Sequence, residues 1–224
     1  ITSDSTCDLS PELLRENDIE LFPLFINKGD ESFRDGVDIQ PADIFAHVAA
    51  GGALCSTAAV PVGVFHDRFA ELAKEYDAVF HVNIGSGFSA SHQNAVLAAE
   101  NLPNVYVIDS RNLSTGQGHV VLEACRLAKT ATDPEEMYRQ LNAFAPTVDA
   151  SFLLDRLDYM KKGGRCSAVT LLGANLLRLR PCIEVRDGKM GVGRKYRGSF
   201  DKCVCEYITD KIGNRSDLEL RRVF

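Results

Sequence analysis

The stretch AVFHVNIGSGFSASHQNAVLAAENL, residues 78–102, decides the fold of this chain. Five of its first seven residues are apolar, which is typical of a strand buried in a parallel sheet. Its last ten residues are typical of a helix, and NIGSGFSASH at 83–92 lies between the two. Three serines and two glycines therefore occupy a turn from strand to helix. A helix start leaves backbone amides without partners, so this turn is a candidate site for an anion.

The same alternation of strand and helix continues on both sides of this turn. The patterns predict strands at 19–27, 78–84 and 104–110, and helices at 41–50, 61–76 and 134–148. Residues 111–131 read as a loop followed by a helix. Residues 28–39 read as a turn-rich connection, and the segment just before residue 61 reads as a loop. Alternation of this kind favours an α/β domain with a parallel sheet over residues 1–148.

The pattern changes after residue 148. A strand at 150–155, a short helix ending at Gly163, a helix at 167–179, a hairpin with its turn at DGKM and a helix at 200–212 are expected. These elements predict a smaller α+β domain over residues 149–224. Both ends of the chain read as if cut within strands, so we expect the C-terminal domain to be truncated.

Composition narrows the class of protein. The chain has 224 residues, 45% hydrophobic and 25% charged, and a net charge of −6. That balance is typical of a soluble globular protein and argues against a nucleic-acid partner. No apolar run is long enough to span a membrane, and no signal peptide is evident. The seven cysteines form no CxxC pair, which favours reduced thiols in a cytoplasmic protein. No metal-ligand spacing occurs, so we expect no metal site.

Three chemistries suit a serine-rich turn at a helix start. Phosphate binding lacks support, because there is no GxxxxGK[ST] motif and STGQGH at 114–119 lacks the third glycine of a dinucleotide turn. A nucleophilic serine is not presented by GSGFS in the GxSxG form. His92 is nevertheless placed for chemistry, so an acyl hydrolase using Ser89 and His92 stays an alternative.

Carboxylate binding needs only hydroxyl and amide donors at a helix start. Two segments offer them: Ser56 and Thr57 precede one helix, and Ser86, Ser89 and Ser91 precede another. We expect both segments to be loops at the carboxyl ends of strands, where α/β sheets bind ligands. Each hydroxyl has the alternative role of capping its helix.

Seven blocks, spread in order over essentially the whole chain, resemble the DegV family of fatty-acid-binding proteins. They are TSDSTCDLSPEL, GDESFRDGVDI, CSTAAVPVGVF, IGSGFSASHQNAVLAA, VIDSRNLSTGQGHVVLEA, LDYMKKGGRCS and RPCIEVRDGKMGVGRKYRG. The resemblance implies two α/β domains with a long acyl tunnel between them. It also implies a carrier without catalysis of its own, which holds a long-chain fatty acid while a fatty acid kinase phosphorylates the carboxylate for phospholipid synthesis.

The resemblance assigns head-group residues by position. Thr57 matches the family's head-group threonine, and Ser89 matches its head-group serine in GSGFSAS. Ser56, Ser86, Phe88, Ala90 and Ser91 are the remaining ligand-binding candidates. Ala90 and Ser91 replace a glycine and a threonine of the family pattern, which implies altered head-group geometry or chain preference. The family also uses a histidine in a late H-x-G-P-G block; this sequence ends before that block, so this head-group residue is not assigned.

The partners expected are a long-chain fatty acid and a fatty acid kinase, with transient membrane contact and no cofactor. KKGGR and GRKYRG concentrate positive charge in an acidic protein. Such a patch suits docking on an acidic protein surface or an anionic membrane. Arg197 and Arg165 are the predicted docking residues.

Overall fold

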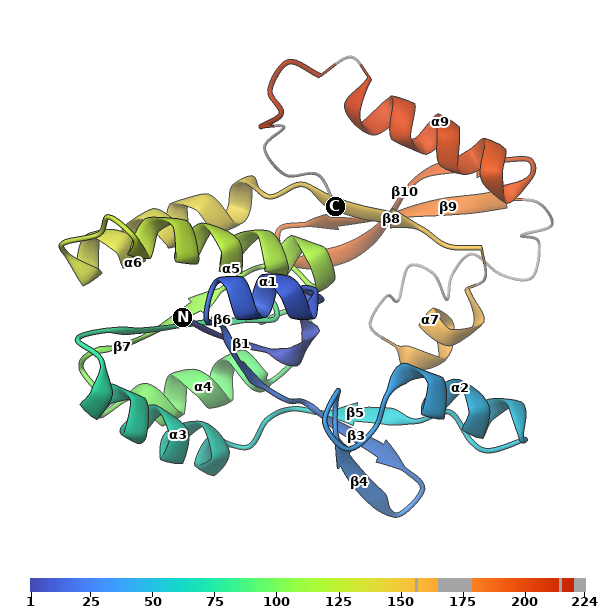
Figure 1. Ribbon diagram of the computed structural model, residues 1–224. Helices are drawn as coiled ribbons and strands as arrows, with labels where there is room; N and C mark the ends of the chain where they lie inside the picture. The colour runs from blue at the N-terminus through green and yellow to red at the C-terminus, as the bar shows by residue number, and fades with distance from the viewer. Residues whose placement is uncertain (156, 165–178, 214, 220–224) are drawn as a thin grey trace. The chain divides into compact units, whose positions relative to one another are not determined.

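The computed structural model describes residues 1–155, 157–164, 179–213 and 215–219 (Figure 1). The chain forms two compact units, Ile1–Val148 and Asp149–Phe224. Residues 167–178 of the helix expected at 167–179 lie outside the described residues.

The first unit carries the candidate turn. In chain order its elements are β1 (Thr2–Asp4), the 3₁₀ helix η1 (Ser5–Cys7), α1 (Pro11–Glu16), β2 (Glu20–Phe22), β3 (Phe25–Lys28), β4 (Glu31–Arg34), α2 (Pro41–Ala49), β5 (Ser56–Ala58), α3 (Val62–Glu75), β6 (Val79–Asn83), α4 (Ser91–Ala99), β7 (Val105–Asp109), α5 (Ser114–Ala128), α6 (Pro134–Phe144) and the 3₁₀ helix η2 (Ala145–Thr147).

A four-stranded parallel sheet forms the centre of this unit, with strand order β2-β1-β6-β7. Figure 1 shows α3 and α4 on one face of the sheet and α5 and α6 on the other. The expected α/β class with a parallel sheet is confirmed. Strand β6 is buried at all five positions, because it lies inside the sheet with helices over both faces.

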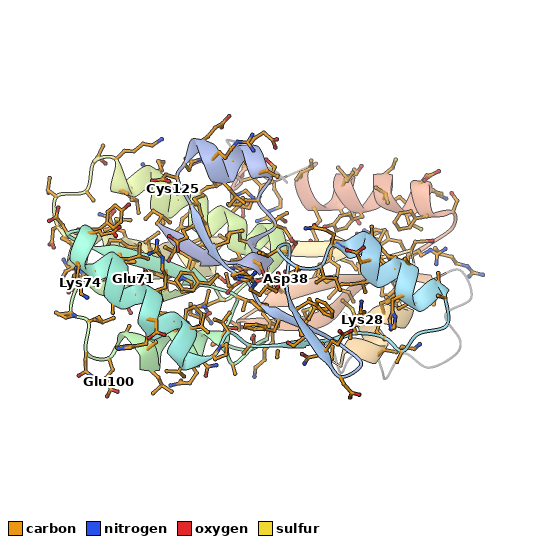
Figure 2. The ribbon with its side chains drawn as sticks, turned by 60° about the horizontal axis from the view of Figure 1, so that its bottom comes forward. Lys28, Asp38, Glu71, Lys74, Glu100 and Cys125 are labelled. Carbon is orange, nitrogen blue, oxygen red and sulfur yellow. The ribbon has the colours of Figure 1, made fainter. Side chains whose placement is uncertain are left out.

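Each face of the sheet has its own apolar core. On α3, Phe65, Phe69 and Leu72 recur at helical spacing and are buried against the sheet. Glu71 and Lys74 of the same helix, labelled in Figure 2, are exposed. On the other face the core includes Phe80, Val82, Ile108, Val120, Val121 and Leu141.

The strand expected at 19–27 is in fact two strands, because it is interrupted at Pro23. Proline lacks the amide that a central strand needs. Strand β2 joins the parallel sheet, whereas β3 is the middle strand of a separate antiparallel sheet of order β4-β3-β5. The expected connection at 28–39 therefore contains a strand, β4, and the expected loop before residue 61 contains β5. Both interpretations were wrong because a short strand is recognisable only through its partner.

The second unit comprises β8 (Ala150–Leu153), α7 (Asp158–Gly163), β9 (Leu179–Arg186), β10 (Lys189–Arg197) and α9 (Phe200–Ile212). Its strands form an antiparallel sheet of order β10-β9-β8. The predicted hairpin is confirmed: Asp187 and Gly188 connect β9 to β10 with φ values of 50° and 70°. Positive φ at both positions is what a two-residue type I′ turn requires. Cys203 of α9 is buried with Cys182 and Tyr196 of the sheet.

Among the described residues, no helix combines the length and the apolar character needed to cross a membrane.

Candidate ligand-binding site

The candidate turn connects β6 to α4, as the sequence predicts. It begins with Ile84 and Gly85 and ends where α4 starts at Ser91. The Gly85 amide donates to the carbonyl oxygen of Asn112 at 2.7 Å. A Cβ atom at Gly85 would lie 3.0 Å from the backbone of Arg111 and Asn112, so only glycine lets the two chain segments approach this closely.

Asp4, at the carboxyl end of the neighbouring strand β1, holds the start of the turn. Its Oδ2 accepts from the Ile84 amide at 2.6 Å and from Asn83 Nδ2 at 3.3 Å. Its Oδ1 accepts from the Thr6 amide, the Thr6 hydroxyl and Gln117 Nε2. The Asp4 side chain is fully buried, so these hydrogen bonds are what make its burial tolerable.

Close packing of α5 places Gln117 beside Asp4. Gly118 follows it, and a Cβ atom there would lie 2.7 Å from the carbonyl oxygen of Cys7. The absence of a side chain at Gly118 lets α5 approach η1. Gln117 Nε2 donates to Ser3 Oγ as well as to Asp4, each at 3.0 Å. Gln117 Oε1 lies 2.8 Å from the Thr6 hydroxyl, whose single proton is shared between Gln117 Oε1 and Asp4 Oδ1.

Asp109, at the end of β7, holds the middle of the turn. Its Oδ1 accepts from the amides of Ser86 and Arg111 at 3.0 and 2.8 Å, and its Oδ2 accepts from the Ser86 hydroxyl at 2.6 Å. The hydroxyl of Ser86 is therefore engaged within the protein. A ligand-binding role for Ser86 stays a prediction and requires exchange of this hydrogen bond.

Ser89 lies at the end of the turn and is half-buried. Its Oγ accepts from the Ser91 amide at 3.1 Å, and its hydroxyl is 3.2 Å from Ser91 Oγ. Ala90 is exposed at the N-cap of α4 and offers no capping side chain. The N-terminus of α4, which carries partial positive charge, therefore lies next to the Ser89 hydroxyl.

Ser91 and Asn94 of α4 connect this turn to the segment that follows β5. The amide of Val60 donates to Ser91 Oγ at 3.3 Å, and Asn94 Nδ2 donates to the carbonyl oxygen of Val60 at 2.8 Å. Val60 and Ser91 are fully buried. The two segments that the sequence singles out for carboxylate binding are thus joined to each other within the first unit.

Thr57 and Ser56 lie on β5, an edge strand of the antiparallel sheet, and both are exposed. Thr57 pairs with Ile26 and Ser56 pairs with Asn27. The expectation that these hydroxyls sit in a loop at the end of a parallel strand was wrong. They do not cap α3 either, since Pro61 is its N-cap and no side chain caps it.

The alternative of a serine hydrolase requires a base hydrogen-bonded to the serine. In this structure the Ser89 hydroxyl is directed at Ser91, and His92 Nδ1 is buried without a hydrogen-bond partner among the described residues. Burial lowers the pKa of the His92 imidazole, and the Asp109 carboxylate acts in the opposite direction. No hydrogen bond between Ser89 and His92 is seen among the described residues.

The remaining predicted residues are one further ligand-binding candidate, Phe88, and the two docking candidates, Arg197 and Arg165. Phe88 is buried in the turn, with its amide donating to the carbonyl oxygen of Gly85 at 2.9 Å. Arg197 is exposed at the end of β10 in the second unit. Arg165 lies outside the described residues.

Sequence reasoning did not identify the residues that hold the turn. These residues are Asp4 and Asp109, and the Asp4 carboxylate also accepts from the Thr6 amide at the start of η1. The signal for their larger role was their place at the carboxyl ends of strands that end at one edge of a parallel sheet. Gln117 and Val60 carried no signal, since nothing around either residue marks a partner far away in the chain.

Comparison with known proteins places the chain in a family. A family model described as an uncharacterised protein of the DegV family matches residues 1–222. A DegV domain-containing protein of Clostridium acetobutylicum is 34% identical over 224 residues, covering 98% of this chain and 80% of its own length. Protein DegV of Bacillus subtilis is 29% identical over 187 residues, covering 82% of this chain and 66% of its own length.

Solved structures agree with this relationship. A DegV family protein from Thermus thermophilus, described for its fatty acid binding, superposes with a TM-score of 0.83 at 27% identity. The match covers 95% of this chain and 77% of that protein. A stearic-acid-binding protein from Eubacterium ventriosum superposes with a TM-score of 0.81 at 28% identity over the same shares of the two chains. The central sheet, the turn after β6 and these similarities together show that the chain belongs to the DegV family.

Proposed function

We propose that this protein binds a long-chain fatty acid and holds its carboxylate at the turn between β6 and α4. The observation that carries the proposal is a pair of hydrogen bonds at Val60: its amide donates to Ser91 Oγ, and its carbonyl oxygen accepts from Asn94 Nδ2. They join the turn that contains Ser89 to the segment that contains Thr57, so the two predicted head-group hydroxyls belong to one assembly. The fatty-acid binding described for the Thermus and Eubacterium proteins supports the same ligand class.

The donors at the turn suit a carboxylate. Ser89 supplies a hydroxyl, and the first turn of α4 supplies amides and partial positive charge. Thr57 supplies a second hydroxyl from β5. Each hydrogen bond to a charged group contributes roughly 1.5–3 kcal/mol. Burial of a chain of about 15 methylenes contributes on the order of 12 kcal/mol before costs, so the acyl chain supplies most of the affinity and the turn fixes its polar end. The position of that chain between the two units stays a prediction.

Organic extraction of the purified native protein, followed by mass spectrometry quantified against protein, tests the ligand. We expect about one long-chain fatty acid per chain. Folded protein that yields no lipid and takes up none when incubated with palmitate would contradict the proposal. Turnover of nitrophenyl esters that Ser89→Ala abolishes would favour the acyl hydrolase instead.

Replacing Ser89 with alanine is expected to weaken fatty-acid binding by roughly 10- to 100-fold, because one hydrogen bond to the carboxylate is lost. Displacement of a fluorescent fatty acid measures the Kd. Because the acyl chain is still buried, the variant should retain measurable binding. A complete loss of bound lipid from folded Ser89→Ala protein would show that the head group, and not the chain, dominates affinity.

Ser10→Ala provides the matched control for this loss of a hydroxyl. Ser10 is an exposed serine of the same unit that caps α1 by accepting from the Leu13 amide at 3.3 Å. Its removal is expected to cost stability of about 1 kcal/mol and to leave the Kd unchanged. Equal losses of affinity in both variants would point to general destabilisation.

We further propose that the bound carboxylate is presented to a fatty acid kinase, which transfers a phosphoryl group to it. Arg197 is exposed on β10, while the nearby Arg194 is paired with Asp210 at 2.6 Å. Within the part of the chain that the structure describes, Arg197 has no ion pair, so its charge is available to an acidic surface.

Reversing this charge with Arg197→Glu is expected to lower the kinase-coupled rate of acyl-phosphate formation at least tenfold while the fatty-acid Kd stays the same, because rim charges act mainly on association. Lys189→Glu is the matched control, since it reverses an exposed charge at the other end of β10. An unchanged rate in Arg197→Glu, or an equal fall in both variants, would remove Arg197 from the docking site.

A further inference from the structure

The Asp4 carboxylate is a fully buried charge that acts directly on the turn. It accepts five hydrogen bonds from described residues, two of them from the residues at the start of the turn, Asn83 and Ile84. No ion pair to Asp4 is seen within the described residues. Its charge is therefore balanced by oriented donors alone, and each of those donors is held in place by the carboxylate in return.

The five donors come from three parts of the first unit. Thr6 belongs to η1, Gln117 belongs to α5, and the last two donors lie where β6 ends at Asn83 and the turn begins at Ile84. Two backbone amides donate to Asp4, and that of Ile84 is the closer, at 2.6 Å from Oδ2. Ile84 is separated from Asp4 by 80 positions in the chain. The start of the turn is thus fixed to the sheet by a charge-assisted hydrogen bond to Asp4 Oδ2, while Asp4 Oδ1 is held by Thr6 and Gln117.

The same arrangement determines which donors remain for a ligand. The Ile84 amide and the Asn83 side-chain amide are directed at Asp4. A carboxylate ligand therefore meets the later part of the turn, which offers the amides that start α4 and the Ser89 hydroxyl. That hydroxyl donates to Ser91 Oγ in this structure and must exchange this hydrogen bond for one to the ligand. The negative charge of Asp4 behind the turn also disfavours a ligand carboxylate that moves inward toward Ile84.

We propose that Asp4 is a positioning residue for carboxylate binding, acting through the Ile84 amide to fix the turn that carries Ser89. This inference rests on the proposed fatty-acid function. A purely structural role, capping η1 through the Thr6 amide, would make Asp4 important for stability but not for the environment of the ligand carboxylate.

Asp4→Asn tests the proposal, because it replaces one carboxylate oxygen with an NH₂ group. Both oxygens of Asp4 accept hydrogen bonds, so this NH₂ group would face another donor and at least one hydrogen bond would be lost. The probe is palmitate labelled with ¹³C at its carboxyl carbon. We expect the carboxyl resonance of the bound palmitate to move and the Kd to rise at least tenfold in folded Asp4→Asn protein. An unchanged resonance and Kd would overturn the inference.

Ser3→Ala is the matched control. Ser3 is also fully buried in this network, where its hydroxyl donates to the Val82 carbonyl oxygen at 2.8 Å and its oxygen accepts from Gln117. The substitution removes buried hydrogen bonds and leaves the bond from Ile84 to Asp4 in place. We expect Ser3→Ala to lower the thermal midpoint while the carboxyl resonance stays at its wild-type position. Equal resonance shifts in both variants would assign the effect to stability and overturn the inference.

A measurement on the wild-type protein covers the case in which Asp4→Asn does not fold. If the Ile84 amide and the ligand carboxylate are coupled, addition of palmitate slows hydrogen exchange at Ile84, because coupling is reciprocal. Unchanged exchange at Ile84 on saturation would overturn the inference. Wild-type protein that binds no palmitate would instead refute the proposed function, so the two failures are distinguishable.

Discussion

Replacing Phe65 with alanine is expected to lower the free energy of unfolding by about 3–5 kcal/mol. Phe65 has no exposed surface, and its ring lies 5.1 Å from that of Phe22 and 5.4 Å from that of Phe69. The substitution removes the transfer free energy of the ring and leaves a cavity between α3 and the parallel sheet. Urea unfolding followed by circular dichroism measures the change.

Val64→Ala is the control for this prediction. Val64 is the preceding residue of α3 and is 45% exposed, so its truncation should change stability by less than about 0.5 kcal/mol. A cost below about 1 kcal/mol for Phe65→Ala would mean that α3 does not close this side of the core. Comparing the two variants also tests which face of α3 packs against the sheet, because a rotation of the helix would bury Val64 and expose Phe65.

Acidification is expected to destabilise the protein through His81. This residue is fully buried on β6, with its ring 5.0 to 5.2 Å from those of Phe22, Phe65 and Phe69. Burial lowers the pKa of His81 to about 3, with a further contribution from the positive charge of His92. In the unfolded chain the imidazole has a pKa of about 6.5. Its contribution to stability is therefore present above about pH 6.5 and is lost progressively as the pH falls toward 3.

Between about pH 7.5 and pH 5 the His81 imidazole binds a proton in the unfolded state but not in the native state. The free energy of unfolding therefore falls by about 2 kcal/mol over this range. Urea unfolding at both pH values measures it. The matched variant is Thr2→Val with His81→Phe, which removes both partners of the 2.8 Å hydrogen bond between Thr2 Oγ1 and His81 Nδ1. We expect the wild-type protein to lose about 2 kcal/mol more stability than this variant.

The half-buried His92 contributes in the same direction, because burial lowers its pKa as well, and its contribution remains in the double variant. Equal losses of stability in the wild-type protein and the variant would mean that His81 is protonated in the native state. That result would contradict its burial between the aromatic rings.

Local patterns in the sequence determined several features of this protein. The apolar run of β6, the serine turn and the helix pattern of α4 follow one another in the chain, and their order alone predicted a strand, an anion-suited turn and a helix. Asp187 and Gly188 predicted the hairpin, because few residues adopt positive φ readily. In each case the residues that interact are close in sequence, so their spacing in the chain is enough to predict the local structure.

Tertiary structure alone decided how the candidate site is held. The Ile84 amide bonds to Asp4 across 80 positions, Ser86 bonds to Asp109 across 23, and Val60 bonds to Ser91 across 31. Strand β5, which carries Thr57, exists only because β3 pairs with it. Contacts between distant segments leave no periodicity in either segment, and a three-residue strand has too few positions to show alternation. The chain thus encodes the turn locally, while its contacts with β1, β7 and the segment after β5 decide which of its donors are engaged within the protein.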